Sequence, residues 1–176
     1  MESPGFLAIW AVVMAAAMLP SEWPLVRLEH ATARSWTRSG ILVSGYVAVW
    51  LAVGAGLMLL PFMVPLWAAL GAAAVYQVTP LKTRCLTDCR APLARILHGW
   101  RDGWAGAFRM GVENGLWCLG CCVGFVLVVF ALGMTSVWWM AAMGAVVLVE
   151  KTLPWGIAAG RAATAALAIG AVVCLL

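Results

Sequence analysis

Long apolar runs separated by short polar stretches set the pattern of this chain. A helix needs about 20 apolar residues to cross roughly 30 Å of hydrocarbon. Six runs approach that length, at residues 5–19, 40–60, 62–79, 106–132, 135–153 and 156–176. The pattern predicts an all-α, polytopic membrane protein. We expect residues 1–176 to form a single transmembrane domain, a bundle of about six helices.

The composition agrees with this prediction. Hydrophobic residues make up 65% of the chain and charged residues 10%, whereas a soluble domain has about 25% charged residues. The net charge of +4 follows from the positions of the basic residues relative to lipid, so we expect no nucleic-acid partner. The sequence has no ATP-binding loop and no HExxH or GxSxG motif, and we therefore predict that the protein is not an enzyme.

Prolines predict where several helices end. Pro20 and Pro24 are expected to end the first span, and Pro61 and Pro65 to mark the turn between the second and third spans. The segment 20–39 is predicted to lie along the cytoplasmic membrane surface, with its arginines facing anionic headgroups.

The basic residues are concentrated in alternate loops. The loops at 20–39 and 80–105 and the connection before the last span are basic, whereas the loops near 61–65 and 133–137 have no Lys or Arg. The positive-inside rule places the basic loops in the cytoplasm and both termini on the outer, periplasmic side. We thus predict a multi-pass protein of the bacterial cytoplasmic (inner) membrane.

A short helix is predicted within the second basic loop. Thr79 is a suitable N-cap, Pro80 fits the first helical position, and Pro92 is expected to stop the helix. Cys85 and Cys89 are four residues apart and so face the same way. They form either a second metal station or an incidental pair, since a reducing cytoplasm disfavours a disulfide. Three nearby basic residues are expected to lower the thiol pKa values: Lys82, Arg84 and Arg90.

A cysteine cluster lies within the fourth span. At 100° per residue, Cys118, Cys121 and Cys122 fall on one stripe of the helix. The same stripe carries the polar Asn114 and two small residues, Gly111 and Gly115. Small and polar side chains in a membrane helix face the bundle interior. We therefore predict that the cysteines line a helix interface or a cavity.

These thiols are candidate metal ligands. Thiolates and thioethers select Cu(I), and the first span offers Met14 and Met18 at i and i+4. Zinc is less favoured because a closed zinc site needs four ligands. The fifth span offers Met140 and Met143, which we interpret mainly as packing residues. The alternative for the whole set is an ordinary core, because Met and free Cys are common there.

Two carboxylates fall inside predicted spans, where ionisable groups are costly. Glu113 is placed to pair with Arg109 at i−4, and Glu150 adjoins Lys151. Both have a structural interpretation, as ion pairs or clamps between helices. Together with Asn114, they are also candidates for a polar relay that moves an ion or a proton.

An ordered set of motifs resembles a bacterial family of membrane proteins of unknown function, described as predicted metal-binding integral membrane proteins. The similarity covers roughly residues 10–155, and it implies a metal site without naming the metal or a reaction. Family members often have Trp and a nearby Met after the last cysteine pair, where this chain reads VGFV. The motifs are YQVTPLK at 76–82, the cysteines at 85 and 89, CLGCC at 118–122 and Glu150-Lys151.

Three functions fit these features. The first is a protein that binds or passes Cu(I) through a Cys/Met-lined site, with a metal-donor protein as partner. The second is a non-catalytic small subunit of a larger membrane complex, suggested by glycines at 111, 115, 156 and 160. The third is a thiol–disulfide protein using Cys121 and Cys122, which ranks last because adjacent cysteines in a helix form strained disulfides.

Overall fold

The computed structural model describes residues 4–59, 64–132 and 137–176, and within these ranges every regular element is an α-helix. The predicted turn at Pro61 and most of the basic-free loop near 133–137 lie outside the described residues. The prediction of an all-α fold is confirmed. The helices are α1 (Pro4–Ala33), α2 (Trp36–Met58), α3 (Leu66–Gln77), α4 (Pro80–Cys89), α5 (Pro92–Gly99), α6 (Gly103–Ala131), α7 (Val137–Thr152) and α8 (Gly156–Val173).

Four of these helices are long and apolar enough to cross a membrane, namely α1 from Leu7 onward, α2, α6 and α8. At 1.5 Å per residue, α3 is about 18 Å long and α7 about 24 Å, less than the thickness of the hydrocarbon core. The fold is therefore compatible with a helical membrane bundle. Six spans and the outward orientation of both termini remain predictions.

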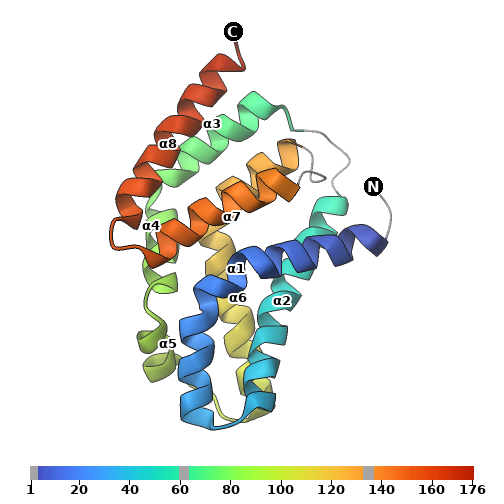
Figure 1. Cartoon of the computed structure of the whole chain (residues 1–176), viewed down its shortest axis with the longest axis vertical. Helices are drawn as coiled ribbons and strands as arrows, with labels where there is room; N and C mark the ends of the chain where they lie inside the picture. Colours follow the sequence, from blue (N-terminus) through green and yellow to red (C-terminus); the bar gives the residue numbers. More distant parts are fainter. Residues whose placement is uncertain (1–3, 60–63, 133–136) are drawn as a thin grey trace.

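Helix α1 corrects the sequence-based expectation that Pro20 and Pro24 end the first span. Both prolines lie inside one helix that continues to Ala33. Each proline removes one backbone N–H donor, and a bend absorbs the clash of its ring. Figure 1 shows α1 changing direction about half-way along its length. The helix ends at Ala33, and the next residue, Arg34, has a φ of 51° and donates its N–H to the His30 carbonyl at 2.7 Å.

The second half of α1 is fixed to the start of α2 by a buried ion pair. Glu29, fully buried, accepts from Arg38 Nε at 2.8 Å and from Ser39 Oγ at 2.6 Å. The Arg38 guanidinium also donates to the Arg101 carbonyl and lies over the Trp100 ring. The prediction that the arginines of this segment face headgroups is therefore wrong for Arg38. Its physical partner is Glu29, one turn before the end of α1.

Helices α2 and α6 pack along the predicted glycine stripe. A Cβ atom added at Gly111 would overlap the carbonyl oxygen of Leu42, and one at Gly115 would lie 2.9 Å from a Val49 methyl carbon. The two backbones therefore approach closely only because glycine occupies these positions. On the opposite side of α6, Leu116 is 54% exposed, as the helical periodicity predicts.

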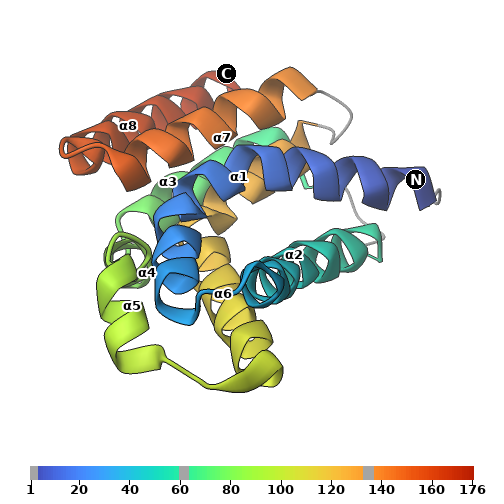
Figure 2. The same cartoon turned by 60° about the horizontal axis from the view of Figure 1, so that its bottom comes forward.

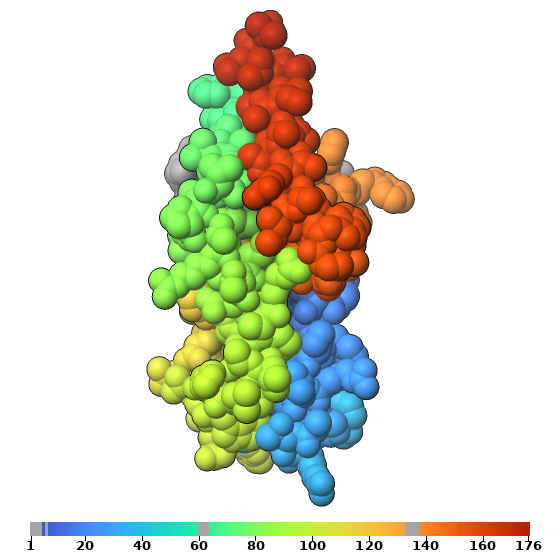
Figure 3. Space-filling model, turned by 90° about the vertical axis from the view of Figure 1, so that its left-hand side faces the viewer, coloured from blue at the N-terminus to red at the C-terminus, as the bar shows by residue number. Residues whose placement is uncertain are grey.

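Helix α6 packs against α2, α3, α4 and α7, whereas α8 packs on α3 and α7. In Figure 1, α3, α7 and α8 gather towards one end of the molecule, and α2 with the second half of α1 occupies the other. Figure 3 shows α8 lying along α3, and the α4–α5 segment lying beside the second half of α1. Figure 2 shows the same segment flanking α6. This arrangement brings α1, α4, α6 and α7 around the cysteine cluster.

The predicted start of the short helix is confirmed. Thr79 is the N-cap of α4, its hydroxyl accepts from the Lys82 N–H at 3.2 Å, and Pro80 occupies the first turn. The helix ends at Cys89, before Pro92 is reached. Pro92 instead opens α5, in agreement with the preference of proline for the first turn of a helix.

Candidate functional site

The three cysteines of α6 lie in the core, as their stripe predicts. The side chains of Cys118, Cys121 and Cys122 are all buried, and their thiols are free. Cys121 and Cys122 both direct Sγ at the Cys118 carbonyl oxygen, at 3.1 and 3.0 Å. This carbonyl would otherwise accept only its helical hydrogen bond. The thiols are thus held close to their own helix turn.

Methionines from two further helices line a cavity together with Cys122. A cavity of about 10 Å³ is lined by Met14 and Met18 of α1, Cys122 of α6, and Met140 and Met143 of α7, with apolar residues completing the wall. Met14, Met18 and Met140 are buried. The structure therefore brings the first-span methionines to the cysteine helix. It adds the pair from α7 that the sequence had suggested only as packing residues.

A buried polar network flanks the remaining thiol, Cys118. Lys151 Nζ and Tyr46 Oη each lie 3.0 Å from Cys118 Sγ. Lys151 also forms an ion pair with Glu22 at 2.9 Å, and Asn114 donates to the same carboxylate at 2.6 Å. The network links α1, α2, α6 and α7 around one sulfur. Asn114, a predicted polar residue of the site, is therefore part of it.

Two members of this network, Glu22 and Tyr46, were not predicted from the sequence. Glu22 lies between Pro20 and Pro24 and was assigned to a surface segment because the prolines were expected to end the span. A carboxylate immediately after an apolar run, combined with a continuous helix, is the signal that would have identified it. For Tyr46, the signal is a hydroxyl in the middle of the second apolar run.

Glu150 belongs to a second buried ion pair. It accepts from Lys82 Nζ at 2.6 Å and from Gln77 Nε2 at 3.1 Å. Lys82 also donates to the Cys121 carbonyl at 2.6 Å, so this pair is connected to the cysteine helix. The adjacent residues Glu150 and Lys151 therefore have different partners, on different helices. Glu150 clamps α7 to α4, which corresponds to the structural interpretation of this residue.

Glu113 has a different environment from Glu150. It accepts from Arg109 at 3.1 Å, as the i−4 spacing predicts, and from Arg101 at 2.9 Å. Its side chain is 37% exposed. Ion pairs with this exposure contribute little to stability. In the described parts of the chain, Glu113, Arg101 and Arg109 form no hydrogen bond or ion pair with the sulfur cluster.

The thiols of α4 face α6. A Cβ atom added at Gly120 would lie 2.5 Å from Cys85 Sγ, so glycine makes room for this thiol. Cys89 packs against the buried cluster that contains Cys121. A hydrogen bond with the Cys121 thiol, together with burial, raises the pKa of Cys89. Burial also raises the pKa of Cys85. The structure thus places Cys89 beside the α6 cluster.

The prediction that nearby basic residues lower these pKa values is wrong. For Cys85, burial outweighs the neighbouring positive charge, because the charged thiolate loses more hydration than that charge returns. For Cys89, the hydrogen bond with Cys121 and then burial outweigh it. The basic groups also have other partners. Lys82 pairs with Glu150, and Arg90 donates to the carbonyls of Glu150 and Leu153 at 3.2 and 2.8 Å.

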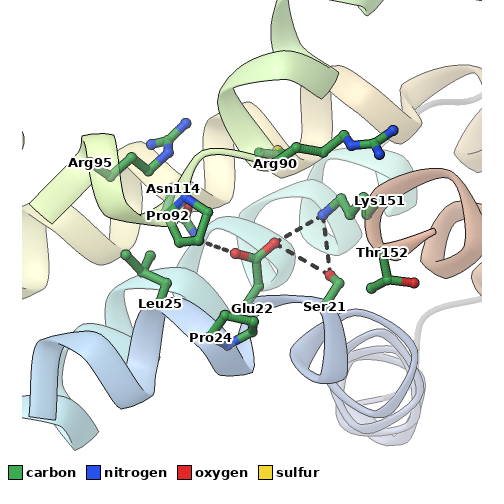
Figure 4. A pocket seen from close by; sticks show the side chains of 11 residues that line it. Ser21, Glu22, Pro24, Leu25, Arg90, Pro92, Arg95, Asn114, Lys151 and Thr152 are labelled. Carbon is green, nitrogen blue, oxygen red and sulfur yellow. Dashed lines mark hydrogen bonds and ion pairs between the residues drawn. The ribbon is translucent and has the colours of Figure 1, made fainter. Parts of the chain in front are cut away.

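A cleft of about 210 Å³ opens beside this network. In Figure 4, the Glu22 carboxylate lies at its centre, between Asn114 and Lys151, with Arg90 and Arg95 on the side of the α4–α5 segment. Cys89 also lines the cleft. The cleft therefore joins the charged network around Cys118 to a thiol of α4.

The chain matches one protein family over residues 7–174, nearly its whole length. It belongs to the PpoB2 family, described as copper chaperones. No curated protein and no solved structure matches the chain. Membership of the PpoB2 family supports a link to copper, and the resemblance to metal-binding proteins noted from the motifs is to that extent confirmed. The connection to a membrane rests on the four long apolar helices.

The donor atoms in this PpoB2 member suit a soft ion. In residues 4–59, 64–132 and 137–176, no three His, Cys, Asp or Glu side chains are grouped to hold a metal ion. The sulfur-bearing side chains that line one cavity are those of Cys122 and the four methionines. Thiols and thioethers are soft ligands, whereas zinc sites use thiolate, imidazole or carboxylate ligands.

Proposed function

We propose that this protein binds Cu(I) within the membrane and passes it to or from a partner. The observation that carries the proposal is the sulfur-lined cavity formed by Met14, Met18, Cys122, Met140 and Met143. Copper is the cargo, and the protein performs no catalytic chemistry. The family description supports a copper role, and the four long apolar helices support a membrane location.

The cavity is suited to a dehydrated ion. Its volume of about 10 Å³ is at the lower limit for holding one water molecule. Thioethers are neutral, weakly hydrated ligands, so placing them in a dry core costs little free energy. Cys122 supplies a thiol that can become the anionic ligand. Cu(I) held by one thiolate and one or two thioethers is electrically neutral overall, which suits a low-dielectric interior.

Copper loading of purified protein tests this proposal. We expect the reduced protein, loaded anaerobically and desalted, to retain about one equivalent of Cu(I), consistent with its soft donor set. The double variant Met18→Leu, Cys122→Ser is expected to lose most of that copper, because two of the sulfurs that line the cavity are removed. Copper content is measured by mass spectrometry on the folded fraction.

Cys174→Ser is the matched control for this experiment, since Cys174 is an exposed cysteine near the C-terminal end of α8. It should load like the unaltered protein. Retention of a full copper equivalent by the double variant would show that the cavity is not the binding site. Failure of the unaltered protein to bind Cu(I) would overturn the proposed function itself.

A further inference from the structure

The charged cleft is lined by buried residues at its base and by exposed residues at its opening. Its floor is formed by the buried side chains of Glu22, Asn114 and Lys151, and exposed Pro24 and Thr152 stand at its margin. These residues come from α1, α6 and α7. The cleft therefore extends from the outside of the protein to the polar network that contacts Cys118.

Cys89 connects this cleft to the sulfur cluster. Among the described residues, it is the one cysteine in the cleft lining, and its side chain is partly exposed. It also packs against the buried cluster that contains Cys121 of α6. Cys85 lies one turn earlier on α4, is buried against Gly120 and does not line the cleft. One of the two α4 thiols therefore has access to both the cleft and the core.

The cleft has an excess of positive charge. Three cations, Arg90, Arg95 and Lys151, line it together with one carboxylate, Glu22. Lys151 and Glu22 neutralise each other at 2.9 Å. Arg90 and Arg95 donate to backbone carbonyls, and in the part of the chain that the structure describes neither forms an ion pair. The remaining charge thus favours an anion.

We infer that this cleft is a port for copper carried as an anionic complex with a small thiol, and that Cys89 is the first protein sulfur to bind the ion. The inference rests on the proposed function. A Cu(I) ion held by two thiolates has a net negative charge, which matches Arg90 and Arg95. A cleft of about 210 Å³ can take the thiol end of a small peptide but not a folded domain.

Transfer at this port is a ligand exchange without change of oxidation state. The Sγ atom of Cys89 forms a bond to Cu(I), and the bond from Cu(I) to one donor thiolate breaks. The departing thiolate takes the proton that the Cys89 thiol gives up. The next exchange, from Cys89 to Cys121, follows the same balance between two neighbouring sulfurs.

The test compares uptake rate with equilibrium loading. Reduced, copper-free protein in detergent is mixed anaerobically with Cu(I) bound to glutathione, and bound copper is followed over time. We expect Cys89→Ser to take up copper at least about tenfold more slowly than the unaltered protein, while reaching the same final content. Cys85→Ser is the matched control on the same helix and should keep the original rate. Cys89→Ala serves as a second variant should the serine form fold poorly.

The charge of the donor provides a second arm. Cu(I) bound to cysteamine, a cationic thiol, should be taken up more slowly than the glutathione complex, and Arg90→Gln combined with Arg95→Gln should remove that difference. The inference would be overturned if Cys89→Ser took up copper at the rate of the unaltered protein. It would also be overturned if Cys85→Ser slowed uptake as much as Cys89→Ser does. Loss of final copper content in Cys89→Ser would also overturn it, by making Cys89 a ligand of the storage site. Absence of copper binding by the unaltered protein would instead contradict the proposed function.

Discussion

Replacing Glu150 with leucine is expected to lower the free energy of unfolding by about 3–5 kcal/mol, because it leaves an unpaired charge in the core. Glu150 and Lys82 have side chains that are 1% and 5% exposed and lie 2.6 Å apart. Lys82→Met should destabilise the protein by a similar amount. The double variant should recover much of the loss, since no buried charge then remains without a partner. Denaturant unfolding in detergent measures all four proteins.

Glu113→Leu is the control for this cycle. Its carboxylate is 37% exposed and pairs with Arg101 and Arg109, so its loss should change the free energy of unfolding by less than about 1 kcal/mol. Were Glu150→Leu no more destabilising than Glu113→Leu, the buried pair would not hold α7 against α4. Simple additivity of the two single changes would show that Lys82 and Glu150 act independently.

Gly111→Val is expected to cost about 3 kcal/mol of stability by forcing α2 and α6 apart. A Cβ at this position meets the backbone carbonyl of Leu42, which no rotamer change can move away. The measured quantity is again unfolding in detergent. The α2–α6 contact also positions Tyr46 against Cys118.

Gly40→Ala provides the comparison for this change. Gly40 lies in α2, and a Cβ there meets no atom within 4 Å. The substitution should stabilise the protein by up to about 1 kcal/mol, since alanine favours the helix over glycine. A Gly111→Val variant as stable as the Gly40→Ala variant would contradict the close approach of the two helices.

Local pattern was sufficient to predict the features that depend on one helix. The stripe that carries Cys118 and Gly111 is buried, and the Thr79 cap opens α4. In both cases, the decisive residues lie within a few positions of one another. The ion pair between Glu22 and Lys151 joins residues 129 positions apart. It depends on which helices pack together, and the periodicity of each helix carries no such information.

Two errors of the sequence analysis have the same physical origin. The predicted lowering of the Cys85 and Cys89 pKa values followed from charges that are close in sequence. Burial has the larger effect on Cys85, and the hydrogen bond with Cys121 of α6 has the largest effect on Cys89. The first span was expected to end at Pro20 and Pro24 because these residues lack a backbone N–H group. The continuous helix is stabilised by partners elsewhere in the chain, including Lys151 for Glu22.

The continuity of α1 has a mechanical consequence. The carbonyls of Ala16 and Pro20 receive no helical hydrogen bond from Pro20 and Pro24, so the helix is most easily bent at this place. After the bend, Glu22 is held in place by its ion pair. Before the bend, the first half of α1 carries Met14 and Met18, which line the cavity. A small further bend would move Met14 and Met18 away from Cys122 while the second half of α1 stays in place. Such a motion would open the cavity without a rearrangement of the whole bundle.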